Sequence, residues 1–161
     1  MQNSTKFEIH NGKKLRRKVR AIISDQDGNF LLIQPHSYKA HSWSFVGGGV
    51  EEGESIDEAI RRELKEEVGI EDVISLKVSA IRPWYEFSQK IKQARNADYD
   101  GQIASLFWIE ISNNTPIQLQ AEEVKDFRWA KIDKVRELVT VPEQLEWFNS
   151  VIEELSKLKV A

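Results

Sequence analysis

The sequence predicts an α/β fold in which a mixed β-sheet lies between helices. Short runs of β-branched and aliphatic residues recur along the chain, which is typical of strands. Two segments, residues 55–69 and 142–157, carry apolar residues at the spacing of an amphipathic helix. Strands combined with two such helices favour one sheet that lies between them.

The 161 residues are enough for one domain with a proper core. Residues 1–14 are polar and are predicted to be loose, while residues 15–161 are predicted to form the single domain. Strands are expected before the first helix over residues 19–24, 30–34 and 43–45. Asp27-Gly28 indicates a hairpin between the first two strands, and the third leads into a glycine loop at residues 47–49.

The first helix has clear signals at both ends. Ser55 is a good N-cap residue, and Glu58 three positions later completes a capping box. Gly69 is the residue type expected just past a helix C-terminus. The residues between these ends are therefore predicted to be helical.

Two glutamates lie on the apolar side of this helix. The apolar stripe consists of Ile56, Ala59, Ile60, Leu64 and Val68. At roughly 100° per residue, Glu63 and Glu67 fall inside or at the edge of the stripe, and Glu66 lies roughly 60° from Glu63. Arginine and lysine side chains, including Arg62, are predicted on the opposite, solvated side.

This placement of carboxylates is costly without a ligand. Glutamates three or four residues apart have Cβ atoms about 5–6 Å apart. Each like-charged pair then costs on the order of 2–3 kcal/mol at an effective dielectric constant of ~20. A divalent cation removes the penalty, and an all-oxygen ligand set suits Mg²⁺ or Mn²⁺. The alternative is an ordinary charged surface helix with arginine and lysine partners.

The second half of the chain alternates strands and connectors before it ends in a helix. Elements are expected at residues 74–87 (one or two strands), 103–111 (strand), 116–120 (connector or short strand), 127–130 (strand) and 142–157 (helix). Pro83 marks a bulge or a sheet edge. Residues 88–101 are polar and irregular, and are long enough to be a binding loop.

Composition excludes several functional classes. The chain has no cysteine, which rules out disulfides and thiolate chemistry and is compatible with a cytoplasmic protein. No apolar run approaches the ~20 residues that span a bilayer, so no membrane association is expected. The net charge of −3 gives no general case for nucleic-acid binding. The sequence leaves the oligomeric state open.

The stretch from the glycines through the first helix resembles the Nudix box, G-x5-E-x7-R-E-U-x-E-E-x-G-U, in which U is a bulky aliphatic residue. Every defined position is matched, by Gly48, Glu54, Arg62, Glu63, Leu64, Glu66, Glu67, Gly69 and Ile70. The resemblance implies the Nudix α/β/α sandwich with a mixed β-sheet. It also implies an Mg²⁺-dependent enzyme that hydrolyses a pyrophosphate bond in a nucleoside diphosphate linked to another moiety.

The resemblance also assigns roles within the box. Glu63, Glu66 and Glu67 resemble the metal ligands, and the carbonyl of Gly47 is a further expected ligand. A bound metal would neutralise phosphate oxygens and lower the pKa of the attacking water. Arg62 resembles the catalytic-site arginine, which pairs with Glu54 and orients the carboxylates. Glu63 or a nearby acid is expected to be the general base, and the sequence does not decide which.

Glu123, six residues before Trp129, is the expected site residue outside the box. The segment is similar to one in dinucleoside polyphosphate hydrolases and RNA pyrophosphohydrolases that supplies another acidic ligand or a base. Glu122 is the neighbouring candidate, and a solvated loop glutamate is the alternative. Val46 departs from this branch, because many of its members have proline at that position.

Three residues are expected to contact substrate: Arg82 through phosphate, and Tyr85 and Phe87 by stacking on a base. Trp84 and Tyr99 are further stacking candidates. Packing is the alternative for each of the four rings, and a surface salt bridge is the alternative for Arg82. A basic run is formed by Lys13, Lys14, Arg16, Arg17, Lys18 and Arg20. This run is interpreted either as a phosphate or RNA contact or as a solvated strand edge that resists aggregation.

The preferred substrates are dinucleoside polyphosphates or the 5′-triphosphorylated end of RNA. The alternatives are a nucleoside triphosphate, a nucleotide sugar, or a Nudix module that senses a nucleotide without cleaving it. Sensing modules commonly lose carboxylates of the box, and this chain keeps all of them.

Overall fold

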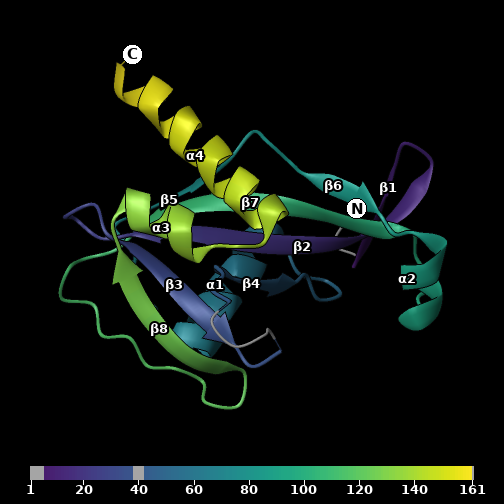
Figure 1. Cartoon of the computed structure of the whole chain (residues 1–161), viewed down its shortest axis with the longest axis horizontal. Helices are drawn as coiled ribbons and strands as arrows, with labels where there is room; N and C mark the ends of the chain where they lie inside the picture. The colour runs from purple at the N-terminus through teal and green to yellow at the C-terminus, as the bar shows by residue number, and fades with distance from the viewer. Residues whose placement is uncertain (1–5, 38–41, 161) are drawn as a thin grey trace.

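The fold is an eight-stranded mixed sheet with helices on both faces, as predicted (Figure 1). The computed structural model describes residues 6–37 and 42–160. The strands are β1 (Phe7–His10), β2 (Lys13–Ser24), β3 (Phe30–Pro35), β4 (Val46–Gly49), β5 (Ser75–Val78), β6 (Trp84–Glu86), β7 (Gly101–Glu110) and β8 (Val124–Ala130). The helices are α1 (Ile56–Val68), α2 (Gln89–Ala94), α3 (Ile132–Leu138) and α4 (Pro142–Val160). None of the described helices is long and apolar enough to cross a membrane.

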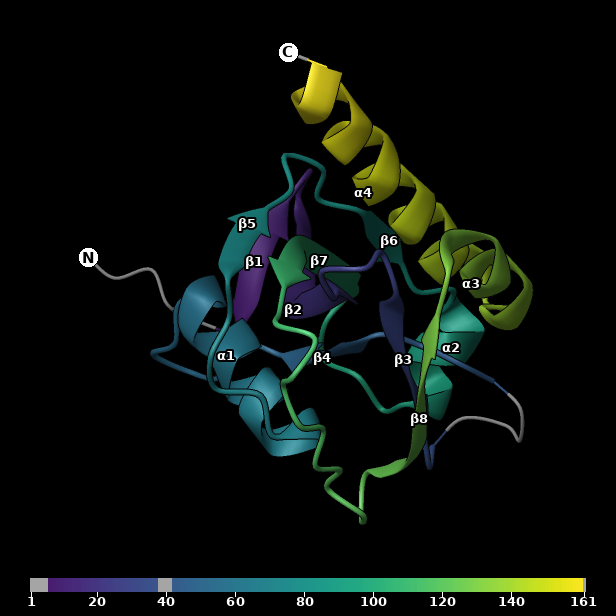
Figure 2. The same cartoon turned by 90° about the vertical axis from the view of Figure 1, so that its left-hand side faces the viewer.

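The long strand β2 organises the sheet. One of its edges pairs in parallel with β7 along its length, from Leu15 opposite Gly101 to Ser24 opposite Glu110. The other edge pairs in turn with β1, β4 and β3, all antiparallel. β3 pairs with β2 only at the Ser24–Phe30 position and continues instead along β8. β3 and β8 therefore diverge from β2, and β4 pairs with β2 between the positions of β1 and β3 (Figure 2).

The two faces of the sheet carry separate cores. Val19, Ala21 and Ile23 alternate along β2 and pack with the apolar stripe of α1. Ile22, on the other face, belongs to a second core with Phe148 of α4. Figure 2 shows α1 on one side of the sheet and α3 and α4 on the other, so the α/β/α arrangement is confirmed.

The predicted signals at the ends of α1 are confirmed. The backbone N–H of Glu58 donates to Ser55 Oγ, and the N–H of Ser55 donates to Glu58 Oε1, which completes the capping box. Gly69 adopts a left-handed conformation with φ 70° just past the last turn. The helix therefore starts and stops where local chemistry dictates.

The expectation of a loose segment over residues 1–14 is wrong for the part that the structure describes, while residues 1–5 lie outside it. Strand β1 forms a hairpin with β2, in which His10 is opposite Lys13. The connecting Asn11 and Gly12 have φ values of 51° and 75°. An Asn-Gly pair with positive φ at both positions is the preferred two-residue hairpin turn, so the sequence did carry this signal.

Three other expectations need correction. The glycines at residues 47–49 form strand β4 rather than a loop, while Ser44 makes only an isolated bridge to Ile33. The segment 88–101 includes helix α2, whose N-cap Ser88 accepts from the N–H of Ile91. Helix α3 was not expected, because its short sequence lacks a side-chain N-cap hydrogen bond.

Candidate active site

Helix α1 packs against β4 and turns two carboxylates toward that strand. Glu63 and Glu67, one helical turn apart, are only 8% and 9% exposed. The backbone N–H of Gly47 donates to Glu67 Oε1 at 2.9 Å. A Cβ atom on Gly48 would lie 2.3 Å from Glu63 Oε1, so the strand closes directly over this carboxylate. The predicted inward direction of both side chains is confirmed.

Burial makes both carboxylates weaker acids than usual. Burial raises the pKa of Glu67 to about 7, against the lowering effect of the Gly47 N–H. Burial also raises the pKa of Glu63, although the Arg62 guanidinium opposes the shift. Raised pKa values of this kind are typical of carboxylates at binding or catalytic sites. Burial of a carboxylate disfavours its charged form and does not by itself stabilise the fold.

Arg62 holds the site together. Its Nε and Nη2 donate to the two carboxylate oxygens of Glu54 at 2.6 and 2.9 Å, which is the expected ion pair. Nη1 donates to Glu63 Oε1 at 2.9 Å, and Nη2 donates to the carbonyl of Gly49 at 2.8 Å. Arg62 was expected on the solvated side of the helix, but its long side chain folds across the helix surface to reach these acceptors.

Glu66 and Glu123 lie at the rim of the site. The Glu66 side chain is half exposed and accepts from Arg62 Nη1 at 3.4 Å. Glu123 is exposed immediately before β8, and its charge raises the pKa of both Glu63 and Glu67. His36 contacts this loop through two hydrogen bonds. Its backbone N–H donates to the carbonyl of Glu123, and its ring Nε2 lies 2.8 Å from the carbonyl oxygen of Ala121.

The carboxylates have the oxygen chemistry that suits a hard divalent cation, although the described side chains are not grouped around one site. Within residues 6–37 and 42–160, no three acidic or histidine side chains are already close enough to hold an ion. Glu63 is turned toward Arg62, and Glu67 toward the Gly47 N–H. Each of these carboxylates has a second oxygen for which the described residues provide no hydrogen-bond donor. Rotation of flexible side chains is therefore needed for the carboxylates to share one ion.

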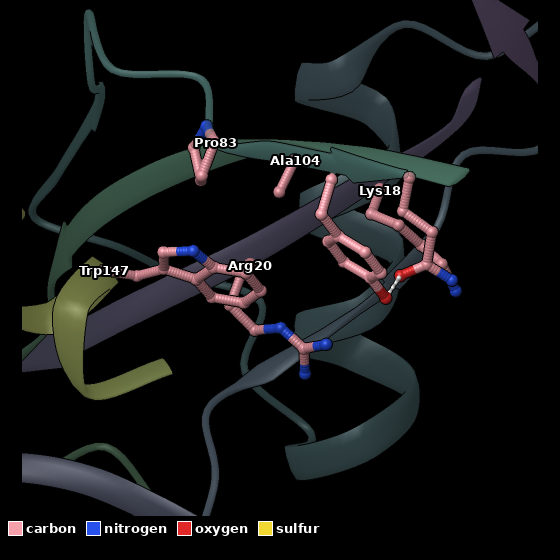
Figure 3. A pocket seen from close by; sticks show the side chains of 7 residues that line it. Lys18, Arg20, Pro83, Ala104 and Trp147 are labelled. Carbon is pink, nitrogen blue, oxygen red and sulfur yellow. Dashed lines mark hydrogen bonds between the residues drawn. The ribbon is translucent and has the colours of Figure 1, made fainter. Parts of the chain in front are cut away.

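A second group of side chains lies on the sheet face opposite α1, next to β4. The pocket there is lined by Lys18, Arg20, Pro83, Tyr85, Gln102, Ala104 and Trp147 (Figure 3). Arg20 reaches into it from β2, and Trp147 from α4. The Tyr85 hydroxyl donates to Gln102 Oε1 at 2.8 Å. The pocket combines cationic side chains, aromatic rings and an amide.

The structure separates the three predicted substrate contacts. Tyr85 lines the pocket and is 40% exposed. Phe87 is only 6% exposed, and packs against Tyr85 and Tyr99. Arg82 forms a two-bond ion pair with Glu8 of β1. The described pocket thus includes Tyr85 but neither Phe87 nor Arg82.

Sequence reasoning treated the basic run as one unit and missed its division. Lys13 pairs with Glu86, and Lys14 lies over the ring of Phe7. Lys18 and Arg20 line the pocket instead. The signal was present, since cations at alternating positions of a central strand place two charges on one sheet face. Gln102 and Trp147 gave no such signal, because strand pairing and helix packing bring them in.

Comparisons with known proteins agree with the motif. A sequence model of the NUDIX domain matches residues 14–151. The chain is 30% identical over 139 residues to an RNA pyrophosphohydrolase of Campylobacter jejuni, covering 81% of this chain and 86% of that one. It is 32% identical over 124 residues to the nucleoside triphosphatase NudI of Escherichia coli, covering 72% and 82%.

A solved structure shows the same fold. The Escherichia coli dihydroneopterin triphosphate pyrophosphohydrolase superposes with a TM-score of 0.68 at 21% identity, covering 81% of this chain and 90% of that chain. At this identity the likeness concerns the fold alone.

Proposed function

This chain belongs to the Nudix family of hydrolases, which act on pyrophosphate bonds and use divalent metal ions, and from that premise we propose an Mg²⁺-dependent enzyme acting on nucleoside polyphosphates. The observation that carries the proposal is the pair of buried carboxylates, Glu63 and Glu67, beneath the glycine strand. Buried like charges one turn apart are unfavourable unless a cation joins them.

The ligands would come from both sides of the site. Glu63, Glu66 and Glu67 of α1, with the carbonyl of Gly47, would hold Mg²⁺ or Mn²⁺, and Glu123 would contribute from the loop before β8. The ion would supply a Lewis acid for phosphate oxygens and acidify the attacking water. An all-oxygen donor set of this kind suits these hard cations.

The protein side chains supply orientation and a proton acceptor. Arg62 fixes Glu63 through one hydrogen bond while Glu54 and the Gly49 carbonyl fix Arg62. Glu63 or a nearby acidic side chain would accept the proton of the attacking water.

For the substrate, we favour the 5′-triphosphorylated end of RNA or a dinucleoside polyphosphate. The RNA pyrophosphohydrolase of Campylobacter jejuni aligns over 86% of its length, which supports the first. The exposed ring of Tyr85, 40% accessible, offers a stacking surface at the pocket for a further nucleotide. The similarity to NudI supports a nucleoside triphosphate as the second candidate.

A module that only senses nucleotides is the less favoured reading. The chain retains every acidic residue of the box, and the network of Arg62 positions them. Sensing would not require this costly arrangement of buried carboxylates. Nucleotide substrates and the lack of cysteine are compatible with action in the cytoplasm.

The deciding experiment is a substrate panel with and without metal. Triphosphorylated RNA, diadenosine tetraphosphate, nucleoside triphosphates, a nucleotide sugar and ADP-ribose are incubated with the purified chain in Mg²⁺, Mn²⁺ or EDTA. We expect hydrolysis that stops in EDTA and returns with either metal. Undiminished hydrolysis in EDTA would contradict the metal mechanism, and no turnover of any compound would contradict the enzyme assignment.

Metal binding has an independent readout. An ion that binds only the folded state raises the melting temperature. We expect Mg²⁺ or Mn²⁺ to raise the Tm of the wild type above its metal-free value. The double variant Glu63→Gln/Glu67→Gln should have the same Tm with and without metal. An equal increase in both proteins would place the ion elsewhere.

A further inference from the structure

Strand β2 presents Lys18 and Arg20 to the pocket on the face opposite α1. Neither forms a salt bridge with an acidic side chain of the described residues. Arg20 Nη1 donates to the carbonyl of Phe45 at 2.9 Å. The Lys18 ammonium group makes no hydrogen bond to the described residues. Two cations thus line a partly buried pocket without a carboxylate partner.

The surroundings of Lys18 are mostly positive. Burial lowers the pKa of Lys18, and Arg20, Arg16 and Arg95 lower it further. Glu63 is the acidic group that acts on it in the opposite sense. Clustered cations that are shielded from water are unfavourable unless an anion binds among them. The pocket therefore places like positive charges close together, as the carboxylate site places like negative charges close together.

Gly47 connects the two sites. Its N–H donates to Glu67, so it points away from β2 and toward the free edge of β4. Arg20 lies opposite Gly47 in the strand register, and its Cδ would be 3.0 Å from a Cβ atom at that position. The arginine side chain therefore crosses over Gly47 toward the edge where Glu67 lies. Its charge lowers the pKa of Glu67, which is consistent with this proximity.

We propose that Lys18 and Arg20 bind a substrate phosphate beyond the two that share the cleaved bond, so that the enzyme favours chains of three or more phosphates. This inference rests on the proposed function, because it assumes that the carboxylates of α1 act on the pyrophosphate. Gly47 of β4 lies between the two sites, so a polyphosphate chain that passes the free edge of β4 would reach from one to the other.

The other lining groups suit a phosphate attached to a nucleoside. The Tyr85 hydroxyl donates to Gln102 Oε1, which leaves the Gln102 amide nitrogen to donate to a ligand. Trp147 extends from α4 toward Arg20 and offers an aromatic surface for a base (Figure 3). A neutral sugar would not require two cations, whereas a charged phosphate does.

The test compares substrates that differ in the number of consecutive phosphates. ATP and diadenosine tetraphosphate have three or more, while ADP-ribose has two. For Lys18→Met/Arg20→Gln we expect kcat/KM on ATP and diadenosine tetraphosphate to fall by about tenfold or more, mainly through KM. We expect kcat/KM on ADP-ribose to change by less than about threefold. Lys90→Gln, an exposed lysine of α2, is the matched charge control and should leave all three values unchanged.

An equal loss on all three substrates would overturn the proposal, as would no loss on any. Arg20→Lys keeps the charge and should retain part of the preference for longer chains. The melting temperatures of the variants verify folding.

A binding measurement separates this inference from the proposed function. Inorganic tripolyphosphate is titrated into the metal-free chain in EDTA by calorimetry, where no turnover is needed. We expect the wild type to bind it and the double variant to bind about tenfold or more weakly. Equal binding to both proteins, or no binding to the wild type, overturns the proposal even if hydrolysis is found. Tripolyphosphate binding that depends on both cations, without hydrolysis of any substrate, would instead contradict the proposed function.

Discussion

Gly48 lies directly over the carboxylate of Glu63, such that a Cβ atom on the glycine would be 2.3 Å from Oε1 and 2.7 Å from Cδ. The backbone of Gly48 does not have positive φ, so glycine is needed here for space rather than for conformation. The strand and the helix can therefore approach only while residue 48 has no side chain.

Gly48→Ala is predicted to displace Glu63 while leaving the fold intact. We expect kcat to fall by roughly 100-fold, since a shift of about 1 Å at a catalytic group has an effect of this size. Steady-state kinetics and a melting curve measure the two effects. Gly49→Ala is the matched control, because its Cβ would meet the flexible end of Arg16 instead of a carboxylate. Similar kcat values for the two variants would contradict the importance of the contact.

Glu67→Gln is predicted to abolish turnover without unfolding the protein. The amide has the shape of the carboxylate, and its oxygen can still accept from the Gly47 N–H, but it lacks the charge that binds a cation. We expect the same loss for Glu66→Gln. Rates near wild type in either variant, measured with saturating Mg²⁺, would remove that residue from the metal site.

The stability of the metal-free protein is predicted to fall as pH rises from about 4.5 to 7. Burial raises the pKa of Glu67 from 4.5 to about 7. Between these values the folded state binds more protons than the unfolded state, so the unfolding free energy decreases with increasing pH. The fall should be on the order of 1–3 kcal/mol and should level off above pH 7. The raised pKa of Glu63 acts in the same direction.

Urea unfolding in EDTA at a series of pH values measures this slope. Glu67→Gln has no titrating group at the position and should show a smaller decrease over the same window. An identical pH dependence in the variant and the wild type would show that Glu67 titrates normally in the folded protein.

Glu123→Ala is predicted to lower kcat strongly while leaving the Tm unchanged. The residue is exposed, but its charge acts on both Glu63 and Glu67, so removing it also lowers the pKa values of those groups. Glu122→Ala, the neighbouring exposed glutamate, is the control and should behave like wild type. An unchanged rate in Glu123→Ala would make it an ordinary loop residue.

Local chemistry explains why α1 was predictable. Caps at Ser55 and Gly69 and an apolar repeat of helical period are properties of adjacent residues, and they fix which side chains face the sheet. The inward direction of Glu63 and Glu67 followed from this periodicity alone. Arg62 was misplaced, because its direction depends on acceptors from β4 and the preceding loop rather than on helical phase.

Residues outside the helix depended on long-range pairing. Arg82 binds Glu8, a residue 74 positions away in sequence, and Phe87 is covered by rings that include Tyr99. No local pattern reports such partners, because each forms only when distant strands become neighbours. The Asn11-Gly12 turn differs, since its conformation is a local preference that was readable in the sequence.

The sequence by itself determined the box helix, the acidic character of the site, the mixed sheet and the family, because these depend on residue type and short-range spacing. The tertiary structure decided that β4 closes over Glu63, that Glu123 approaches the same carboxylates, and that Lys18 and Arg20 share a pocket with Trp147. The physical reason is that strand register and helix packing set distances between residues far apart in the chain. A local pattern of side chains carries no information about those distances.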